Sequence, residues 1–213
     1  MKKLLALCVA SFIALSVVPV LAESANKAVE YSGDGASIQY DITIPFSPAR
    51  IILTSTGKNS NIDIKLSAGW RTHKFKTDST LVDFLDNSGE YDLFAEGTGK
   101  WTLRVEPIGN NGTISVKGKG PYVGSFFNFT EPTIVVITYK AGRVNGLLSN
   151  FIVRLNHQGR YLGGWTSDGL ANKLLVSNDS ERMEKIIQPT KGREEYFWSI
   201  LCDPEVSWEI TVK

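Results

Sequence analysis

Hydrophobic and polar residues alternate with a period of two along most of this chain. In the clearest run, residues 36–44, every second residue is apolar, and Pro45 ends the run. Such alternation buries one face of a strand and leaves the other in water, which is typical of antiparallel sheets. The pattern predicts an all-β protein. Similar runs occur at residues 62–66, 91–95, 101–105, 127–129, 151–155, 196–200 and 208–212.

Two short segments are continuously apolar instead of alternating. Ile51–Leu53 and Ile134–Ile137 therefore predict central strands that are covered on both faces. Clusters of Gly, Asn, Asp and Pro separate the strand-like segments at intervals typical of a sandwich. The segments that favour a helix are short and weak, and they are Thr80–Leu85 and Glu181–Ile187.

One pattern of residues occurs twice, in the same order. The spacing between matched features grows steadily from 85 to 107 residues, as insertions in a second copy would produce. We infer an internal duplication. The matched features are Gly33-Asp34-Gly35 with Gly118-Lys119-Gly120, residues 60–66 with 149–155, Gly69-Trp70 with Gly164-Trp165, Tyr91 with Tyr196, and Trp101 with Trp208.

Each copy is long enough for a small sandwich of seven or eight strands. We therefore predict two tandem jelly-roll-like antiparallel β-sandwich modules, residues 23–110 and 111–213, with a boundary near Asn110-Asn111-Gly112. Ile114 and Val116 fit the last strand of the first copy or the first strand of the second. The alternative is a single large sandwich to which each copy contributes half.

The first 22 residues have the composition of a signal peptide. Lys2 and Lys3 precede an uncharged apolar stretch, Leu4–Val18, and Val20-Leu21-Ala22 form a small-residue cleavage signal. The stretch is shorter than the roughly 20 residues of a comfortable membrane span. The sequence predicts an exported protein, periplasmic or extracellular, whose mature chain begins near Glu23, and an uncleaved anchor is the alternative.

Composition narrows the classes of partner. Removal of Lys2 and Lys3 changes the formal net charge from +1 to −1, so the mature chain has no global field that attracts nucleic acid. No second apolar run reaches membrane length, which predicts no transmembrane segment in the mature chain. Cys202 is the remaining cysteine and shares strand parity with Trp198 and Ile200. It is predicted to be a buried thiol.

The end of each copy resembles a known kind of module. Gly89–Ala95 followed by Trp101–Val105 is similar to the final hairpin of bacterial prepeptidase C-terminal-type sandwiches, and Asn61–Leu66 resembles their acidic alternating strand. The resemblance covers most of the first copy and, more loosely, the second. It implies a secreted jelly-roll-like sandwich, often an accessory or binding module. Val153 stands where the first copy has Asp63, so the calcium role sometimes associated with such modules is not predicted.

Motifs for catalysis are few. His73 and His157 do not match in the repeat, and neither lies in a metal-binding spacing. The chain has no G-x-S-x-G motif. We predict no catalytic residue, no metal site and no cofactor. A hydrolase that uses one of the histidines, or Cys202 with a histidine, is the less favoured alternative.

Aromatic and basic residues are the better candidates for binding. Trp70 and Trp165 each follow a glycine at the mouth of a variable loop, where an indole can stack on a sugar or cap the sandwich. The segment 70–76 is the most basic of the mature chain and suits an anionic partner, or an edge strand protected by lysines. The residues predicted to bind a ligand are Trp70, Arg71, His73, Lys74, Tyr161 and Trp165.

The leading functional prediction is an exported, non-catalytic protein. Its loops would bind an envelope or extracellular polymer, a glycan or a protein, in a carbohydrate-binding or related role. The alternative is a structural or assembly component of the cell envelope or extracellular matrix, which would make its contacts through sheet edges and module faces. The sequence leaves the oligomeric state open.

Overall fold

The computed structural model describes residues 27–69, 71–142, 149–158, 165–175, 178–191 and 195–213, and these residues form β-strands joined by turns. Within these described residues there is no helix long and apolar enough to cross a membrane. The strands are β1 (Val29–Asp34), β2 (Ser37–Ile44), β3 (Ala49–Ala68), β4 (Arg71–Thr77), β5 (Thr80–Leu85), β6 (Gly89–Pro107), β7 (Val116–Lys119), β8 (Tyr122–Val123), β9 (Thr133–Lys140), β10 (Ser149–Gln158), β11 (Trp165–Leu175), β12 (Ser180–Ile187), β13 (Tyr196–Leu201) and β14 (Ser207–Val212).

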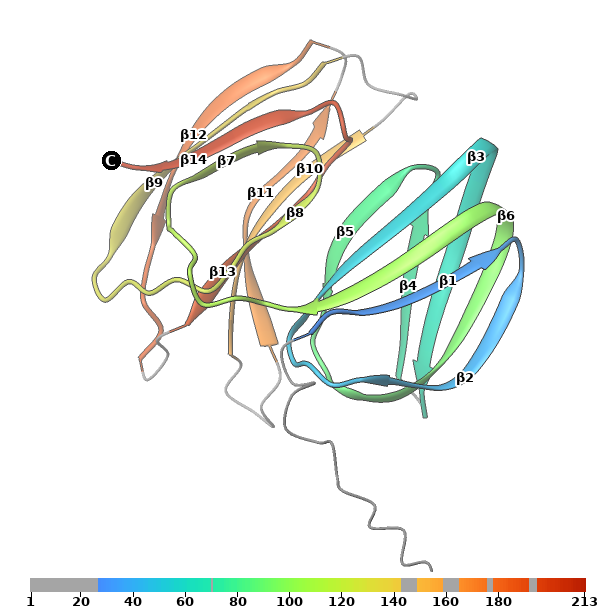
Figure 1. The fold of residues 1–213 in the computed structure, drawn as a ribbon. Helices are drawn as coiled ribbons and strands as arrows, with labels where there is room; N and C mark the ends of the chain where they lie inside the picture. The colour runs from blue at the N-terminus through green and yellow to red at the C-terminus, as the bar shows by residue number, and fades with distance from the viewer. Residues whose placement is uncertain (1–26, 70, 143–148, 159–164, 176–177, 192–194) are drawn as a thin grey trace, which may run out of the picture.

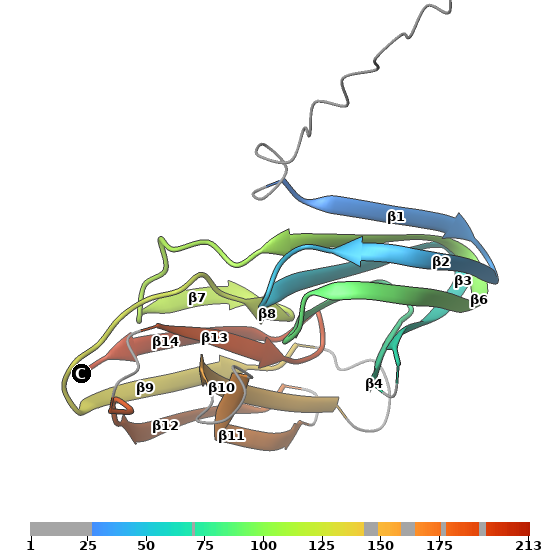
Figure 2. The same ribbon diagram turned by 90° about the horizontal axis from the view of Figure 1, so that it is seen from below.

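The first sandwich is one antiparallel sheet folded into two layers (Figures 1 and 2). The long strands β3 and β6 run through both layers. One layer has the order β5, start of β3, end of β6, β1. The other layer has the order β4, end of β3, start of β6, β2. Gly97 lies where β6 changes layers, with φ +128°, and a Cβ there would collide with the Asn61 carbonyl oxygen.

The second sandwich repeats this strand order with separate strands. Its sheets are β12-β9-β14-β7 and β11-β10-β13-β8. β9 and β10 therefore correspond to the two halves of β3, and β13 and β14 to the two halves of β6. Every described pairing joins strands of the same sandwich, and each sandwich encloses a buried hydrophobic cluster of its own. Val116 pairs with Ile210 of β14 and belongs to the second copy.

The register shows the duplication at the level of single residues. In the first copy Gly33 lies opposite Trp101, and a Cβ on Gly33 would lie only 2.6 Å from the indole ring. The Trp101 Nε1 group donates a hydrogen bond to the Gly35 carbonyl oxygen at 3.1 Å, and Gly35 has φ +64°. Glycine is therefore required twice, once to make room for the ring and once for the left-handed turn.

The second copy builds the same arrangement. Gly118 lies opposite Trp208, with 2.7 Å from the Cβ position to the ring. The Trp208 Nε1 group donates to the Gly120 carbonyl oxygen at 2.7 Å, and Gly120 has φ +75°. The matched Gly-x-Gly and Trp features of the sequence are thus one structural motif that appears in each sandwich.

Two predictions about individual segments are wrong. Both helix candidates are strands, because Thr80–Leu85 is β5 and Glu181–Ile187 lies in β12, each paired along its length with a central strand. Such pairing overrides a weak local preference for helix. Ile134–Ile137 lies in the central strand β9, as predicted, with Val135–Ile137 buried, but Ile134 is 40% exposed.

Cys202 is buried in the core of the second sandwich with Trp198 and Ile200, as the sequence predicts. Burial, with a smaller contribution from the charge of Asp203, raises the pKa of its thiol from 9.0 to about 12. Between pH about 9 and about 12 the thiol therefore stays protonated in the folded state, whereas it is ionised in the unfolded chain.

A thiol-reactive dye tests this placement of Cys202. At pH 8 folded residues 23–213 should react far more slowly than the same residues in denaturant, because the thiolate is the reacting species. The raised pKa also has a consequence for stability. The contribution of the thiol is fully present below pH about 9 and is lost as the pH rises towards 12. Equal labelling rates in the two states would contradict burial.

The two sandwiches pack against each other through β5 of the first and β8 and β13 of the second (Figure 1). Phe84 of β5 meets Phe197 of β13 edge to face, with ring centroids 5.2 Å apart. Phe126 contacts the same ring at 5.7 Å, and Ile108 and Val123 are buried beside it. The outer face of the β8-β13 layer is therefore a docking surface for the first sandwich.

Candidate functional site

The first sandwich has a face equivalent to this docking surface. In the second sandwich Val123 lies opposite Ser199, and in the first Ile38 lies opposite Phe94 at the matching place in the repeat. Val123 is covered by the first sandwich and is 2% exposed, whereas Ile38 is 56% exposed. The same kind of surface is buried in one sandwich and uncovered in the other.

We call this uncovered surface the open face, and define it by Ile38, Tyr40, Lys65, Lys74 and Phe94 on β2, β3, β4 and β6. Four of these residues form one row across the sheet, because Lys74 pairs with Lys65, Lys65 with Phe94, and Phe94 with Ile38. Side chains directly opposite one another in a sheet lie on the same side of it. The row therefore presents two cationic and two apolar side chains together.

Aromatic contacts hold the centre of the open face. The Tyr40 side chain is 66% exposed and meets the Phe94 ring edge to face, with centroids 6.4 Å apart. The Lys65 Nζ atom lies 5.4 Å from the centroid of the same ring, within range of a cation–π interaction. These contacts restrain Phe94 and leave the Tyr40 ring available to a partner.

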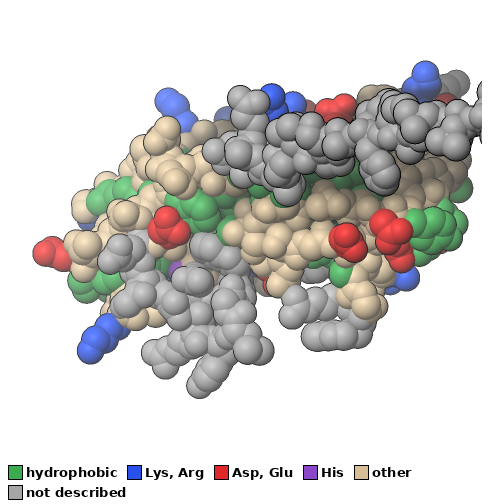
Figure 3. All heavy atoms as spheres, turned by 60° about the horizontal axis from the view of Figure 1, so that its bottom comes forward, with side chains coloured by type: hydrophobic (Ala, Val, Ile, Leu, Met, Phe, Trp, Pro, Cys, Tyr) green, Lys and Arg blue, Asp and Glu red, His purple; other side chains and the backbone are tan. Residues whose placement is uncertain are grey.

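A hollow of about 430 Å³ adjoins the row. Asp63, Lys65, Lys74, Phe94 and Glu96 contribute to its lining, so charges of both signs surround one aromatic ring. Figure 3 shows surface hydrophobic side chains next to acidic ones at the end of the molecule formed by the first sandwich. An apolar centre with polar groups around it can hold a sugar ring or a protruding apolar side chain.

The predicted ligand-binding residues are only partly placed by the structure. Lys74 is exposed on the open face. Arg71 and His73 belong to β4, and Trp165 begins β11, but the side chains of these residues lie outside the described part. Trp70 and Tyr161 are themselves outside the described residues.

The sequence interpretation takes residues 71–90 and 166–195, which follow the two Gly-Trp pairs, as variable loops, whereas much of their described length is strand. Segment 71–90 contains β4 and β5, and segment 166–195 contains most of β11 and all of β12. β4 lies at the end of the described sheet order, as the edge-strand interpretation of the basic segment predicts. Lys74 is thus presented by an edge strand.

Sequence reasoning missed Ile38 and Tyr40 because it placed them on the buried face with Ile42. The register shifts between Gln39 and Ile42, where Asp41 has φ +53°. A β-bulge of this kind adds a residue to one strand and reverses the faces beyond it. Ile42 therefore enters the core while Ile38 and Tyr40 face outwards, and the alternating sequence gives no sign of the change.

The geometry separates Cys202 from His157. His157 pairs with Tyr196 across the sheet, and Cys202 follows Tyr196 by six positions. At roughly 3.3 Å per residue this is about 20 Å, so the two cannot form a nucleophile–base pair. The His157 Nε2 atom instead lies 3.6 Å from the Asp168 carboxylate. Among the described residues no three His, Cys, Asp or Glu side chains are grouped to hold a metal ion.

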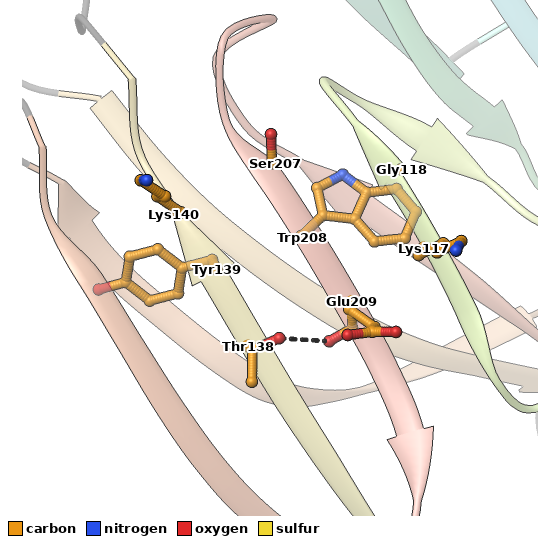
Figure 4. Close-up of a pocket in the computed structure, with 8 residues that line it drawn as sticks. All are labelled: Lys117, Gly118, Thr138, Tyr139, Lys140, Ser207, Trp208 and Glu209. Carbon is orange, nitrogen blue, oxygen red and sulfur yellow. Dashed lines mark hydrogen bonds between the residues drawn. The ribbon is translucent and has the colours of Figure 1, made fainter.

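A second hollow, of about 550 Å³, lies on the outer surface of β7, β14 and β9 (Figure 4). Its aromatic members, Tyr139 and Trp208, have buried side chains. Lys117, Lys140 and Glu209 contribute the charged part of its lining. The hollow therefore offers charged groups without an exposed aromatic ring, and the open face is the stronger candidate.

No family model matches the chain, and no curated protein matches it. Among solved structures, the chain is similar to the N-terminal CBM22-1-CBM22-2 tandem domain of Xyn10C from Paenibacillus barcinonensis, with 9% identity, a TM-score of 0.30, and coverage of 78% of this chain and 79% of the other. It is also similar to the stem and receptor binding domain of the spike protein P1 from bacteriophage PM2, with 8% identity, a TM-score of 0.28, and coverage of 87% and 96%.

Proposed function

We propose that this chain is an exported, non-catalytic binding protein, and that the open face of its first sandwich contacts a polymer, glycan or protein of the envelope or extracellular space. The observation that carries the proposal is the contrast between equivalent faces. Val123 and Phe197 are buried beneath the other sandwich, whereas Ile38 and Tyr40 are 56% and 66% exposed. Exposed apolar groups gathered on one face are a mark of interaction sites.

The chemistry of the open face supports binding without a covalent step. Tyr40 and Phe94 provide ring surface, and Lys65 and Lys74 provide donors at the edge of the hollow. Aromatic rings bring large contact area at a small cost in side-chain entropy. The second sandwich serves as the rigid support, because its own equivalent face is occupied.

The test is retention of the mature chain, residues 23–213, on isolated envelope polymers, a glycan panel and envelope proteins. The double variant Tyr40→Ala plus Phe94→Ala should lose retention by about tenfold or more, because central aromatic residues of an interface commonly contribute about 2 kcal/mol or more. Leu174→Ala is the matched control, since Leu174 is an exposed apolar residue, at 58%, on the second sandwich. Circular dichroism confirms that each variant is folded.

Retention that is unchanged in the double variant would contradict the proposal, as would the absence of retention on every surface. Loss of retention in the Leu174→Ala control to the same degree would also contradict it. In that case general hydrophobicity, and not the open face, would account for binding.

A further inference from the structure

The strand edge with which the first sandwich docks has an equivalent on the second. On the first sandwich Phe84 of β5 lies opposite Arg50 of β3, and Phe84 makes the contact with Phe197. In the repeat β12 corresponds to β5 and β9 to the start of β3. The register then places Ile186 where the first copy has Phe84, and Ile134 where it has Arg50.

These two equivalents are uncovered. Ile186 and Ile134 lie opposite each other and are 65% and 40% exposed. On the first sandwich the matching strand positions face the second sandwich, where burial raises the pKa of the Tyr122 hydroxyl and the nearby charge of Arg50 partly offsets the rise. The second sandwich thus carries a docking edge with nothing described on it, and the first carries a docking face with nothing described on it.

We propose that the partner of the open face is a second copy of this chain, which docks its Ile134–Ile186 edge there in the way that β5 docks on the second sandwich. This inference rests on the proposed function, because it names the occupant of the same face. The argument for that occupant is continuity with an interface already present in the molecule. One docking mode, applied again, joins the second sandwich of one copy to the first sandwich of the next.

The residues of the two surfaces are complementary. Ile134 and Ile186 would meet the apolar side chains of the open face, Ile38 and Tyr40 among them. The register places Asp92 where the second copy has the docked Phe197, and the Asp41 amide lies 3.4 Å from the Asp92 carboxylate. Near its apolar residues the open face therefore carries the carboxylates of Asp41 and Asp92 as well as the amino groups of Lys65 and Lys74.

Basic groups lie beside the isoleucine edge. The Lys213 Nζ atom contacts both carboxylate oxygens of Glu184, at 2.9 and 3.2 Å, and Arg182 contacts the same carboxylate at 2.9 Å. Two cations share one carboxylate at this edge, and Asp41 and Asp92 of the open face offer them further acidic partners. Complementary charge of this kind favours the correct partner and the rate of encounter.

The proposed contact joins two different surfaces, so it is heterologous. Each copy carries one edge and one face, and association continues from copy to copy unless the rotation closes a ring. Asp41 and Asp92 replace the aromatic residues of the internal interface, which makes the contact between copies more polar than the contact within a copy. Weak, concentration-dependent association is therefore expected.

Sedimentation velocity of the mature chain over a wide range of concentration tests this. The wild-type chain should show a sedimentation coefficient that rises with concentration. Ile186→Glu removes the edge and Ile38→Glu removes the face, and each variant alone should remain a monomer. Mixed together they should form a one-to-one complex and nothing larger, because each retains the surface that the other lacks. Leu174→Glu should associate like the wild type.

A wild-type chain that remains a monomer at every concentration would overturn the inference, and so would association that either variant leaves unchanged. The proposed function is judged separately by the retention assay. If the chain does not self-associate but the Tyr40→Ala plus Phe94→Ala variant loses retention on a polymer or glycan, the self-docking inference fails and the binding function stands. If retention is also unaffected, both fail.

Discussion

Replacing Trp208 with alanine is expected to lower the free energy of unfolding by about 3–5 kcal/mol. The indole is buried in the core of the second sandwich and lies against Gly118, which has no side chain to fill the space left behind. Its Nε1 group also satisfies the Gly120 carbonyl oxygen at 2.7 Å. Urea unfolding of residues 23–213, followed by fluorescence and circular dichroism, measures the loss.

Two further variants separate the causes of this loss. Trp208→Phe keeps much of the apolar volume and removes the hydrogen bond, so it should lose less than the alanine variant. Trp101→Ala should lower the free energy of unfolding by an amount similar to that of Trp208→Ala, because Trp101 makes the equivalent contacts with Gly33 and Gly35 in the first sandwich. A change below about 1 kcal/mol in both alanine variants would contradict the role assigned to the motif.

Replacing Phe197 with alanine should also lower the free energy of unfolding by about 3–5 kcal/mol, but through the packing between the two sandwiches. The Phe197 side chain faces away from the core of its own sandwich and is buried by Phe84 and Phe126. Its loss therefore weakens the packing between the sandwiches and leaves their separate cores intact. We expect the unfolding transition to broaden or to split in two, because the two sandwiches no longer unfold cooperatively.

A double-mutant cycle of Phe84→Ala and Phe197→Ala isolates this contact. Residues in direct contact typically show coupling energies of about 0.5–3 kcal/mol, and an edge-to-face aromatic pair lies in that range. Tyr40→Ala is the matched control, because Tyr40 is an exposed aromatic residue, and its substitution should change stability by no more than about 0.5 kcal/mol. Additive effects of the two phenylalanine substitutions would show that the sandwiches do not support each other.

The fold class was accessible from the sequence because the duplicated residues are the ones that the fold requires. Gly33 and Gly118 must leave room for an indole, and Trp101 and Trp208 fill the matching cores. Constraints of this kind leave the same residues at the same strand positions in both copies. The parity of Cys202 predicted its burial for a similar reason, since β13 is regular along its length.

The site was not accessible in the same way. The bulge after Gln39 reverses the faces of β2, and neither Tyr40 nor Asp41 signals it in the sequence. The exposure of Ile134 depends on which sandwich face the neighbouring sandwich covers, and that is a property of packing between modules. The alternation of apolar and polar residues in one strand shows which side chains face the core of its own sandwich. It does not show which outer faces are covered by the neighbouring sandwich.

Cross-linking between two variants, each with one introduced cysteine, tests most directly the claim that the open face accepts the same docking mode as the face inside the molecule. Asp92→Cys and Ile186→Cys replace the equivalents of Phe197 and Phe84, whose rings lie 5.2 Å apart. A short bismaleimide added to the mixed variants should give a product of two chains, whereas Cys202 is too buried to react. If the yield does not exceed that of Leu174→Cys mixed with Ile186→Cys, the claim is contradicted.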